Sequence, residues 1–340
     1  MIVHGFAGIG WSEALRTLGL ADTGLELDWN ACKTRAACGH TTIQCDLTQY
    51  PAQPFKGRTT GSIWSPPCQT YSKGGNQAGL ADMALAHQAV DDLAHGHDTR
   101  SRLRGACQDE RSLLVAEPMR FLHAERSEWV AMEQVPAVLP IWRQYSEHLR
   151  TWGYSVWCGI LNAADYGVPQ ARRRAFLIAS RTRNVTAPEP THSENPEHDL
   201  FGQCLPRWIS MAEALGWGYT TRPAPTVTGG GTSTGGAEPF GNGSRKAMQA
   251  AMNDPAHWAW RKPAPTVSGT VGHVGGKQAG GHLNLSAVEG ARLQTFRPGL
   301  PFHGNKGQIS LQIGNAVPPL LAEHVVSAAT GIPLHCEAAA

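Results

Sequence analysis

The chain has 340 residues, of which 41% are hydrophobic, so it is long enough for one large domain and a smaller one around a sizeable core. A formal net charge of +2 at pH 7 argues against a surface that is basic all over and binds nucleic acid, but it does not exclude a local basic cleft. No apolar run is long enough to cross a membrane, and the first residues, MIVHGFAGIG, lack a charged leader with a cleavage signal. We therefore expect a cytoplasmic protein with no membrane partner.

Seven short apolar segments are expected as strands, and helical segments lie between several of them. The expected strands are residues 1–5, 23–27, 41–45, 61–65, 128–135, 154–162 and 173–180. Residues 12–20 predict a helix that ends at Gly19, and residues 111–125 predict a helix in which Pro118 introduces a kink. This alternation predicts an α/β fold with a mostly parallel seven-stranded sheet and helices on both of its faces.

The glycine-rich turn GFAGIG follows the first expected strand and leads into the first helix. Gly8 and Gly10 permit a tight turn and a close approach of a ligand to the backbone. The dinucleotide fingerprint requires a third glycine where this chain has Glu13, which weakens an assignment to NAD. A plain strand–turn–helix junction explains this motif alone equally well.

Acidic side chains follow the next two strands. Glu26 and Asp28 end the second strand in LELD, where a carboxylate can accept both hydroxyls of a ribose. Asp46 follows the third strand, where it can accept a hydrogen bond from an adenine amino group. Each acid alone is more often a solvated loop residue, but three successive strand ends of this kind favour a nucleoside-containing ligand.

The segment SPPCQTYSKGG, residues 65–75, places Cys68 directly after two prolines. A structural cysteine is usually buried in a regular apolar element, but prolines interrupt regular hydrogen bonding. We therefore expect Cys68 at the carboxyl end of a strand, the edge at which open α/β sheets bind ligands.

The other cysteines favour a structural role. Eight cysteines are too few for a disulfide framework in a chain of this length, and we expect thiols in a reducing compartment. Cys32, Cys38 and Cys45 lie near His40 but lack the spacing of a typical zinc site. Separate small core residues are the favoured interpretation, and we expect no metal.

Charged side chains recur at two later strand ends. Glu133 ends an apolar strand in AMEQV, where a carboxyl group can have a raised pKa and act as an acid, or can serve as a cap or an ion-paired residue. Arg172 and Arg174 stand two apart at the start of a strand in VPQARRRAF. Strand periodicity would place them on one face, where both could reach a phosphate or a carbonyl oxygen, although such a run is usually a solvated basic patch.

Composition changes after about Arg183, where Gly, Pro, Thr and Ser become frequent. A near-repeat, RPAPTVTGGG at 222–231 and KPAPTVSGT at 262–270, is interpreted as two similar loop-and-strand elements. Helical signals return in residues 286–296 and 318–331. We therefore expect three segments, which are residues 1–183, a loop-rich inserted domain of residues 184–285, and residues 286–335, which return to the first domain.

In order and spacing, six motifs resemble those of the cytosine-C5 DNA methyltransferases of bacteria and phages. They are FAGIG, PPCQ, EQV, QARRR, ARLQTF and GNAVPP, and they extend from Phe6 to about Val326. The resemblance implies the Rossmann-like fold of S-adenosylmethionine-dependent methyltransferases with a smaller, loop-rich target-recognition domain. Residues 1–183 would then be the catalytic domain and residues 184–285 the target-recognition domain.

The resemblance also implies a mechanism. Cys68 would add to C6 of a cytosine that is flipped out of the duplex, because a stacked base cannot be reached. Glu133 would hold or protonate N3, Arg174 would contact O2, and Arg172 would help to order the site and the nearby phosphate.

Ligand contacts and partners follow from the same resemblance. The donor would be S-adenosylmethionine, which leaves as S-adenosylhomocysteine, and its pocket would contain Phe6, Gly8, Gly10, Glu26, Asp46, Pro67 and Asn315. The substrate would be double-stranded DNA, contacted by Gln69, Ser72, Arg222 and Arg261. We expect a monomer, and whether a cognate restriction endonuclease accompanies it stays open.

The chain departs from the family pattern at three positions. His4 replaces an acidic residue, Ser65 replaces a common glycine, and Gln134 replaces the asparagine beside the catalytic glutamate. A catalytically silent DNA-binding relative is one alternative, which the complete catalytic set disfavours. A nucleotide-binding oxidoreductase would have no reason to contain PPCQ or GNAVPP, and methylation of RNA in place of DNA stays open.

Overall fold

A computed structural model describes residues 1–72, 76–197, 204–216, 254, 256–267, 273–276 and 281–334. The chain divides into two compact units. The first unit contains Met1–Asn162, Arg173–Glu189 and Ala322–Ala340, and the second contains Ala163–Arg172 and Pro190–Leu321. These bounds differ from the three expected segments, because residues 163–172 and 286–321 group with the inserted region and not with the first domain.

The first unit is built on one seven-stranded sheet, as the sequence predicts. Its strands are β1 (Ile2–Gly5), β2 (Asp22–Glu26), β3 (Thr41–Gln44), β4 (Gly61–Trp64), β5 (Trp129–Gln134), β6 (Ser155–Asn162) and β8 (Arg173–Ser180). Their order across the sheet is β3-β2-β1-β4-β5-β8-β6. Neighbours among β1 to β5 run parallel, whereas β8 is antiparallel to both β5 and β6. The predicted α/β class and mostly parallel sheet are confirmed.

This topology gathers many loops at one edge of the sheet. The carboxyl ends of the five parallel strands lie on the same edge, and the antiparallel β8 brings its amino end there, with Gln134 paired to Ala175. The side chains that follow β1, β2, β3 and β4, those that end β5 and those that begin β8 therefore belong to one row. Open α/β sheets bind their ligands along this edge.

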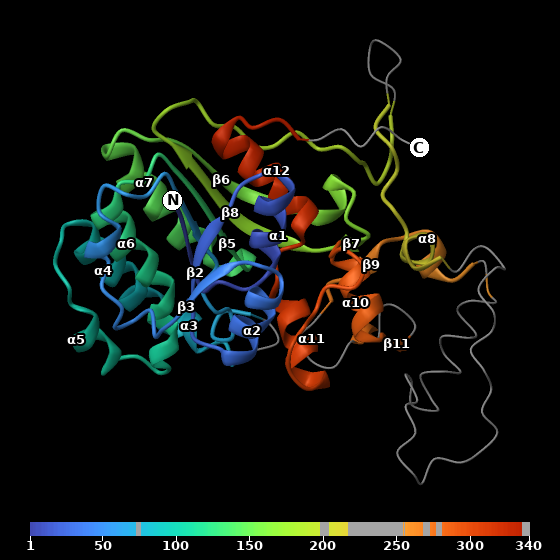
Figure 1. The fold of residues 1–340 in the computed structure, drawn as a ribbon, viewed down its shortest axis with the longest axis horizontal. Coiled ribbons are helices and arrows are strands. Elements are labelled where there is room, and N and C mark those ends of the chain that lie inside the picture. The colour runs from blue at the N-terminus through green and yellow to red at the C-terminus, as the bar shows by residue number, and fades with distance from the viewer. Residues whose placement is uncertain are drawn as a thin grey trace, which may run out of the picture. The chain divides into compact units, whose positions relative to one another are not determined.

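Helices cover both faces of the sheet (Figure 1). The α-helices that lie wholly within the first unit are α1 (Gly10–Thr17), α2 (Trp29–Ala37), α3 (Ala78–Ala81), α4 (Met83–Ala94), α5 (Arg100–Arg104), α6 (Glu117–Glu125) and α7 (Leu139–Thr151). Residues of α4, α6 and α7 share one buried core with alternate residues of the strands, such as Val130, Met132 and Leu177. On the opposite face Trp11 of α1 packs edge-on against Phe176, with ring centroids 6.3 Å apart.

Two helix ends illustrate the local chemistry. Helix α1 ends before Gly19, which has a φ of 71° and supplies the left-handed conformation that stops a helix, as predicted. The expected kink at Pro118 is wrong. Residues Glu110–Ala116 form a 3₁₀ helix, and Pro118 stands in the first turn of α6. Backbone amides in the first turn have no acceptor within the helix, so a proline there costs no hydrogen bond.

The second unit has short elements around a smaller core. They are β7 (Gln170–Ala171), β9 (Ala264–Pro265), β10 (His273–Gly276), β11 (Gly281–Asn284), α8 (Met211–Leu215), α10 (Ala287–Leu293) and α11 (Lys306–Asn315), and α12 (Pro319–Thr330) begins in this unit. Ser286 caps α10 reciprocally with Glu289, which supports the helix expected there. Of the near-repeat, the second copy contributes β9, which pairs with β7, and the first copy lies outside the described residues.

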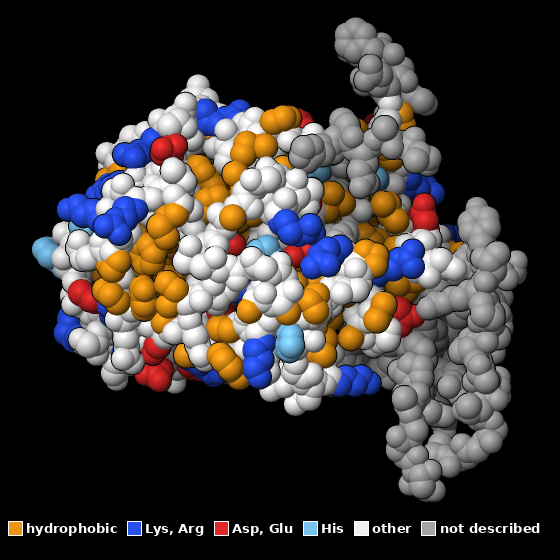
Figure 2. All heavy atoms as spheres, viewed as in Figure 1, with side chains coloured by type: hydrophobic (Ala, Val, Ile, Leu, Met, Phe, Trp, Pro, Cys, Tyr) orange, Lys and Arg blue, Asp and Glu red, His pale blue; other side chains and the backbone are white. Residues whose placement is uncertain are grey.

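The described surface has a mixed character. On the face drawn in Figure 2, Lys and Arg side chains stand in separate groups among neutral and hydrophobic atoms. This agrees with a net charge near zero. Among the described residues, no helix has both the length and the apolar character needed to cross a membrane.

Candidate active site

Cys68 lies in the loop after β4, so the expected position beyond a strand end is confirmed. Its carbonyl oxygen accepts hydrogen bonds from the backbone amides of Tyr71 and Ser72, at 3.0 and 2.9 Å. The Tyr71 ring is buried, and its hydroxyl donates to the carbonyl of Ser112 at 2.9 Å. The backbone at Cys68 is therefore a tight turn tied to the core, while the Cys68 side chain is only half-buried.

Gln134 holds the two prolines that precede Cys68. Its side-chain amide donates to the carbonyl oxygens of Pro66 and Pro67, at 2.9 and 3.1 Å. Gln134 is 1% exposed, so water does not compete for these bonds. The neighbouring strand β5 thereby fixes the path of the chain toward Cys68. Sequence reasoning identified Gln134 as a departure from the family pattern but did not reveal this contact.

Glu133 and Arg174 meet across the pair of strands β5 and β8. The Arg174 Nε lies 3.2 Å from Glu133 Oε1, and the two side chains are 15% and 7% exposed. Arg174 also donates to the carbonyl of Arg173 at 2.8 Å. The pair therefore places a carboxylate and a guanidinium side by side at the sheet edge, which is compatible both with an ion-paired glutamate and with a catalytic one.

Arg172 has a different environment from Arg174. Strand β8 begins at Arg173, so Arg172 lies just before it, and the expectation that the two arginines share one face stays a prediction. Arg172 is 2% exposed, belongs to the second unit, and donates to the carbonyl of Gly314 at 3.0 Å. It therefore contacts the GNAVPP motif, a link that favours an ordering role.

Two buried glutamines connect two predicted motifs, and reach the residue before a third, within the second unit. Gln170 donates to Gln294 Oε1 at 3.0 Å and accepts from the amide of Val267 at 3.0 Å. Gln294 in turn donates to the carbonyl of Ile313 at 2.7 Å. QARRR and ARLQTF thus form one polar network that ends at Ile313, the residue before GNAVPP, and Asn315, a predicted donor contact, stands exposed at the end of α11.

The glycine-rich turn after β1 has room for a ligand. Phe6 adopts a left-handed conformation with a φ of 55°, and the amide of Gly8 donates to the Phe6 carbonyl at 2.9 Å. A Cβ added to Gly8 would meet no atom within 4 Å, so open space adjoins the backbone there. Gly10 begins α1 and is buried. This arrangement fits the cradle expected for S-adenosylmethionine.

Glu26 and Asp46 stand at adjacent strand ends, as predicted. Glu26 accepts hydrogen bonds from the amides of Leu27 and Asp28, at 2.8 and 2.7 Å, but burial outweighs them and raises the pKa of Glu26. Burial also acts to raise the pKa of Asp46, but hydrogen bonds from the amide and hydroxyl of Thr48 prevail and lower it. Asp28 caps α2 through the amide of Ala31, which explains it as a structural residue.

Two hydrophobic residues beside Glu26 were missed. Leu27 is 65% exposed and Trp29 is 55% exposed. Exposed apolar side chains that flank a carboxylate at a strand end suit a ligand with an apolar ring and a polar sugar. The alternation of apolar and acidic residues in LELDW was the available signal.

A buried cluster under the glycine-rich turn was also missed. Arg35 donates to the carbonyl of Gly8 at 2.9 Å and to Asp22 Oδ2 at 3.0 Å. The same Asp22 oxygen accepts from Ser12 at 2.7 Å and lies 2.8 Å from His4 Nδ1. His4, an unexpected residue for the family, thus has its carboxylate partner on the neighbouring strand. Burial lowers the pKa of His4, and Asp22 acts in the opposite direction. The net lowering favours the neutral ring.

The predicted DNA contacts are distributed over both units. Gln69 is exposed and Ser72 half-buried in the first unit, and Arg261 is exposed in the second. Arg222 lies outside the described residues. Within the described ranges, no group of three or more His, Cys, Asp or Glu side chains is arranged to hold a metal ion.

Comparison with known proteins identifies the family. Residues 100–330 match the family described as C-5 cytosine-specific DNA methylase. The chain is 27% identical over 329 residues to the type II methyltransferase M1.HphI of Haemophilus parahaemolyticus, which covers 89% of this chain and 79% of that protein. It is 25% identical over 344 residues to the type II methyltransferase M.NgoFVII of Neisseria gonorrhoeae, with 92% and 82% covered.

Solved structures agree on the fold. A DNA modification methyltransferase encoded within an E. coli prophage aligns with a TM-score of 0.60 at 17% identity, covering 97% of this chain and 98% of that one. The Dnmt2 methyltransferase of S. pombe aligns with a TM-score of 0.58 at 14% identity, covering 96% and 97%. With the family match over two thirds of its length, the chain belongs to the C-5 cytosine-specific DNA methylase family and is a DNA (cytosine-5)-methyltransferase.

Proposed function

We propose that the protein methylates C5 of a cytosine within a specific sequence of double-stranded DNA, through a covalent bond between Cys68 and C6 of the base. The observation that carries this proposal is the row of side chains at one sheet edge. Cys68 follows β4, Glu133 stands on the adjacent β5, and Arg174 stands on β8. The proposed donor contacts Glu26 and Asp46 end or follow β2 and β3 at the same edge.

Cys68 performs the first chemical step. Its thiolate adds to C6, the C5=C6 π bond breaks, and the electron pair makes C5 nucleophilic. The hydrogen bonds of Gln134 to Pro66 and Pro67 fix the backbone from which the sulfur projects. When bound, S-adenosylmethionine supplies an electrophilic methyl group for C5. Loss of the C5 proton to a base and departure of Cys68 from C6 then restore the aromatic ring.

Glu133 and Arg174 stabilise the negative charge that this addition creates on the ring. Electron density moves toward N3 and O2 of the ring as the sulfur attacks. Glu133 holds or supplies a proton at N3, and Arg174, whose Nε is 3.2 Å from Glu133, donates to O2. Arg172 orders the GNAVPP segment through the carbonyl of Gly314.

The donor is held by the other half of the row. Phe6, Gly8, Gly10 and Pro67 line its pocket, and Asn315 is a further proposed contact. Glu26 accepts from the ribose hydroxyls, and Asp46 accepts from the adenine amino group. The open space beside Gly8 and the exposed Leu27 and Trp29 support this assignment.

DNA recognition is assigned to the region of residues 184–285, with the target base flipped out toward Cys68. Gln69, Ser72, Arg222 and Arg261 are the proposed DNA contacts. The designation of the relatives as type II methyltransferases supports a companion restriction endonuclease. A cytoplasmic location and a monomeric state are further parts of the proposal.

Methylation of genomic DNA by the purified protein, followed by base-resolution mapping of 5-methylcytosine, tests the function. One recurrent sequence with 5-methylcytosine at a fixed position is the expected result. Methylation of RNA alone, or of neither polymer, would contradict it. Replacement of Arg261 with alanine should relax one position of that sequence, at about 1–3 kcal/mol, if Arg261 reads a base.

A further inference from the structure

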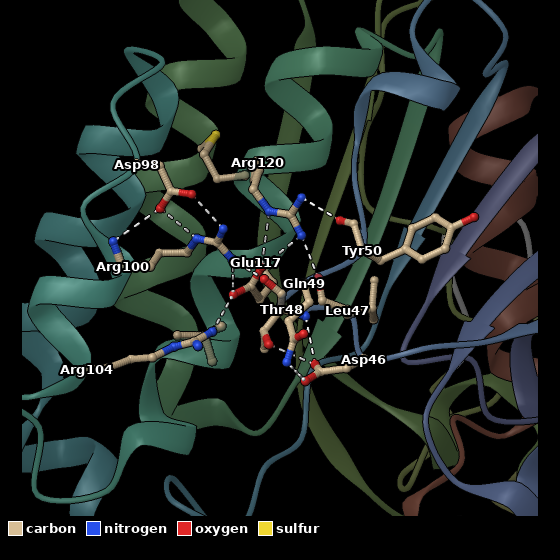
Figure 3. A network of polar contacts seen from close by, with 12 residues as sticks. Asp46, Leu47, Thr48, Gln49, Tyr50, Asp98, Arg100, Arg104, Glu117 and Arg120 are labelled. Atoms are coloured by element: carbon tan, nitrogen blue, oxygen red, sulfur yellow. Dashed lines mark hydrogen bonds and ion pairs between the residues drawn. The ribbon is translucent and has the colours of Figure 1, made fainter.

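Glu117, the first residue of α6, is the centre of a charged network. Its carboxylate is 1% exposed, and Arg100 Nη1 lies 2.6 Å from each of its two oxygens. Arg104 and Arg120 approach the same carboxylate at 3.4 and 3.3 Å. Asp98 binds the far side of Arg100 at 2.6 and 2.8 Å. Three guanidinium groups therefore converge on one buried acid (Figure 3).

Two of these guanidinium groups also hold the segment that follows β3. Arg120 donates to the carbonyl oxygens of Leu47 and Tyr50, the latter at 2.7 Å. Arg100 donates to the carbonyl of Thr48 at 3.1 Å. Three of the four carbonyls in residues 47–50 are thus bound by arginines that share one carboxylate, as Figure 3 shows.

The segment in turn orients Asp46. Asp46 Oδ1 accepts from the amide and the hydroxyl of Thr48, at 2.9 and 2.8 Å. Asp46 Oδ2 accepts from the side chain of Gln49 at 3.2 Å. A carboxylate offers about four acceptor positions, so these three bonds fix the group and leave roughly one position for a ligand. The direction of that position depends on the backbone path of residues 48 and 49.

A purely structural network would not need this arrangement. Burying charges is costly, and an apolar contact between α5 and α6 would join these helices at least as well. The donors of Arg100 and Arg120 instead reach backbone carbonyls of a loop at the ligand-binding edge. A guanidinium can span several acceptors in a fixed geometry, which a point charge cannot do.

We propose that Arg120 and Arg100, fixed on Glu117, are positioning residues for donor recognition, because they hold residues 47–50 so that Asp46 presents its carboxylate to the adenine amino group of S-adenosylmethionine. This inference rests on the proposed function, in particular on the role of Asp46.

The test compares two ligands that differ at the adenine amino group. Calorimetry gives the dissociation constants of S-adenosylhomocysteine and of S-inosylhomocysteine, in which an oxygen replaces the amino group. A hydrogen bond to a charged acceptor should make the wild-type protein prefer the adenosyl compound by about ten- to hundredfold. Asp46→Asn should largely remove this preference.

Arg120→Lys is the decisive variant. It keeps a positive charge near Glu117 but cannot hold two carbonyls at once. We expect the preference to fall below about threefold, with a raised KM for S-adenosylmethionine and an unchanged kcat at saturating donor. Arg150→Lys is the matched control, since Arg150 also donates to a backbone carbonyl, that of Val156, and should keep the full preference. Arg100→Lys replaces Arg120→Lys if the latter does not fold.

The outcomes separate this inference from the proposed function. Equal weakening of both ligands by Arg120→Lys, or an undiminished preference, would overturn the positioning role. A preference that survives Asp46→Asn would overturn the role of Asp46 and this inference with it, but would leave methyl transfer intact. Failure of the wild-type protein to bind S-adenosylhomocysteine would instead overturn the proposed function.

Discussion

The two halves of the ligand-binding edge are held in different ways. At β1, β2 and β3, side-chain carboxylates accept hydrogen bonds from nearby donors, and the buried Arg35 and the half-buried Arg120 bind the carbonyls of Gly8 and of residues 47 and 50. At β4, β5 and β8 the backbone is fixed instead, by Gln134 on the two prolines before Cys68. The half assigned to the donor thus uses charge networks to fix its ligand contacts. The half assigned to catalysis fixes the chain and leaves a reactive side chain partly accessible.

This difference predicts separable defects. Changes at β4, β5 or β8 should slow chemistry and leave donor binding intact. Changes beneath β1, β2 or β3 should weaken or misdirect donor binding and leave the chemical rate at saturation intact.

The largest effect is expected from Cys68→Ser, which removes the nucleophile. Methyl transfer should be lost, while S-adenosylhomocysteine should bind as to the wild type, because the proposed donor contacts at β1, β2 and β3 are unchanged. A DNA duplex with 5-fluorocytosine at the mapped site should trap the wild-type protein covalently, since fluorine at C5 cannot leave as a proton does. Cys204→Ser, at an exposed cysteine, is the control and should retain activity and trapping. Turnover by Cys68→Ser near the wild-type rate would disprove the assignment.

Glu133→Gln should have the next largest effect. The amide can accept or donate a hydrogen bond at N3 but cannot supply a proton, and general acid–base help is worth roughly 100- to 10,000-fold. Single-turnover rates at saturating donor and DNA measure the loss. Glu147→Gln, a change at an exposed residue of α7, should leave the rate unchanged. A fall of less than about tenfold, below that range, would remove Glu133 from the acid–base role.

Gln134→Ala should produce a smaller defect of the same kind. It deletes two buried hydrogen bonds to the backbone before Cys68, worth together about 1–3 kcal/mol, which corresponds to a fall of roughly 5- to 150-fold in the rate of trapping by 5-fluorocytosine. Gln144→Ala is a matched control, because Gln144 also donates to a backbone carbonyl, that of His87. A loss of donor affinity equal to the loss of rate would show that the two halves are not separable.

Sequence reasoning recovered the sheet because its signals are local. Short apolar runs between turn-forming residues mark strands, and every expected strand is present within one or two residues at its ends. The contacts that organise the site are not local. Gln134 reaches Pro66, 68 residues away, and Arg172 reaches Gly314, 142 residues away. A residue pattern can suggest that a side chain is functional, but it cannot identify a partner that only the folded chain brings near.

The same limit explains the specific errors. Pro118 reads as a kink because its neighbours have helical spacing on both sides, whereas the chain changes from a 3₁₀ to an α-helix there. Arg172 and Arg174 have the same local sequence signal, but their partners differ, the carbonyl of Gly314 for Arg172 and the carboxylate of Glu133 for Arg174. His4 reads as an anomaly until Asp22 on the adjacent strand is seen to supply its carboxylate.

The smallest effect concerns pH and the donor half. The pKa of His4 is lowered from its usual 6.5, chiefly by burial, so the folded protein favours the neutral ring. Just below pH 6.5 His4 is protonated in the unfolded chain but stays neutral in the folded chain. The contribution of His4 to the free energy of unfolding is therefore complete above pH 6.5 and is lost as the pH falls. For one proton the loss is no more than about 1.4 kcal/mol per pH unit. Asp22 keeps its charge across this range, since burial acts to raise its pKa but the hydrogen bond from His4 and the charge of Arg35 prevail and lower it from 3.8.

His4→Asn isolates this contribution. Asparagine can donate to Asp22 but does not titrate, so the free energy of unfolding measured in urea should fall less between pH 7.5 and 5.5 than in the wild type. Glu125 acts in the opposite direction, because burial raises its pKa to about 7 and favours the folded state at low pH, but it is present in both proteins and cancels in their difference. His95→Asn, at an exposed histidine, should keep the wild-type slope. Affinity for S-adenosylhomocysteine should follow the same pH dependence in the wild type and lose it in His4→Asn, because His4 and the glycine-rich turn share Asp22 and Arg35. Identical slopes for both proteins would mean that His4 does not couple protonation to the donor half.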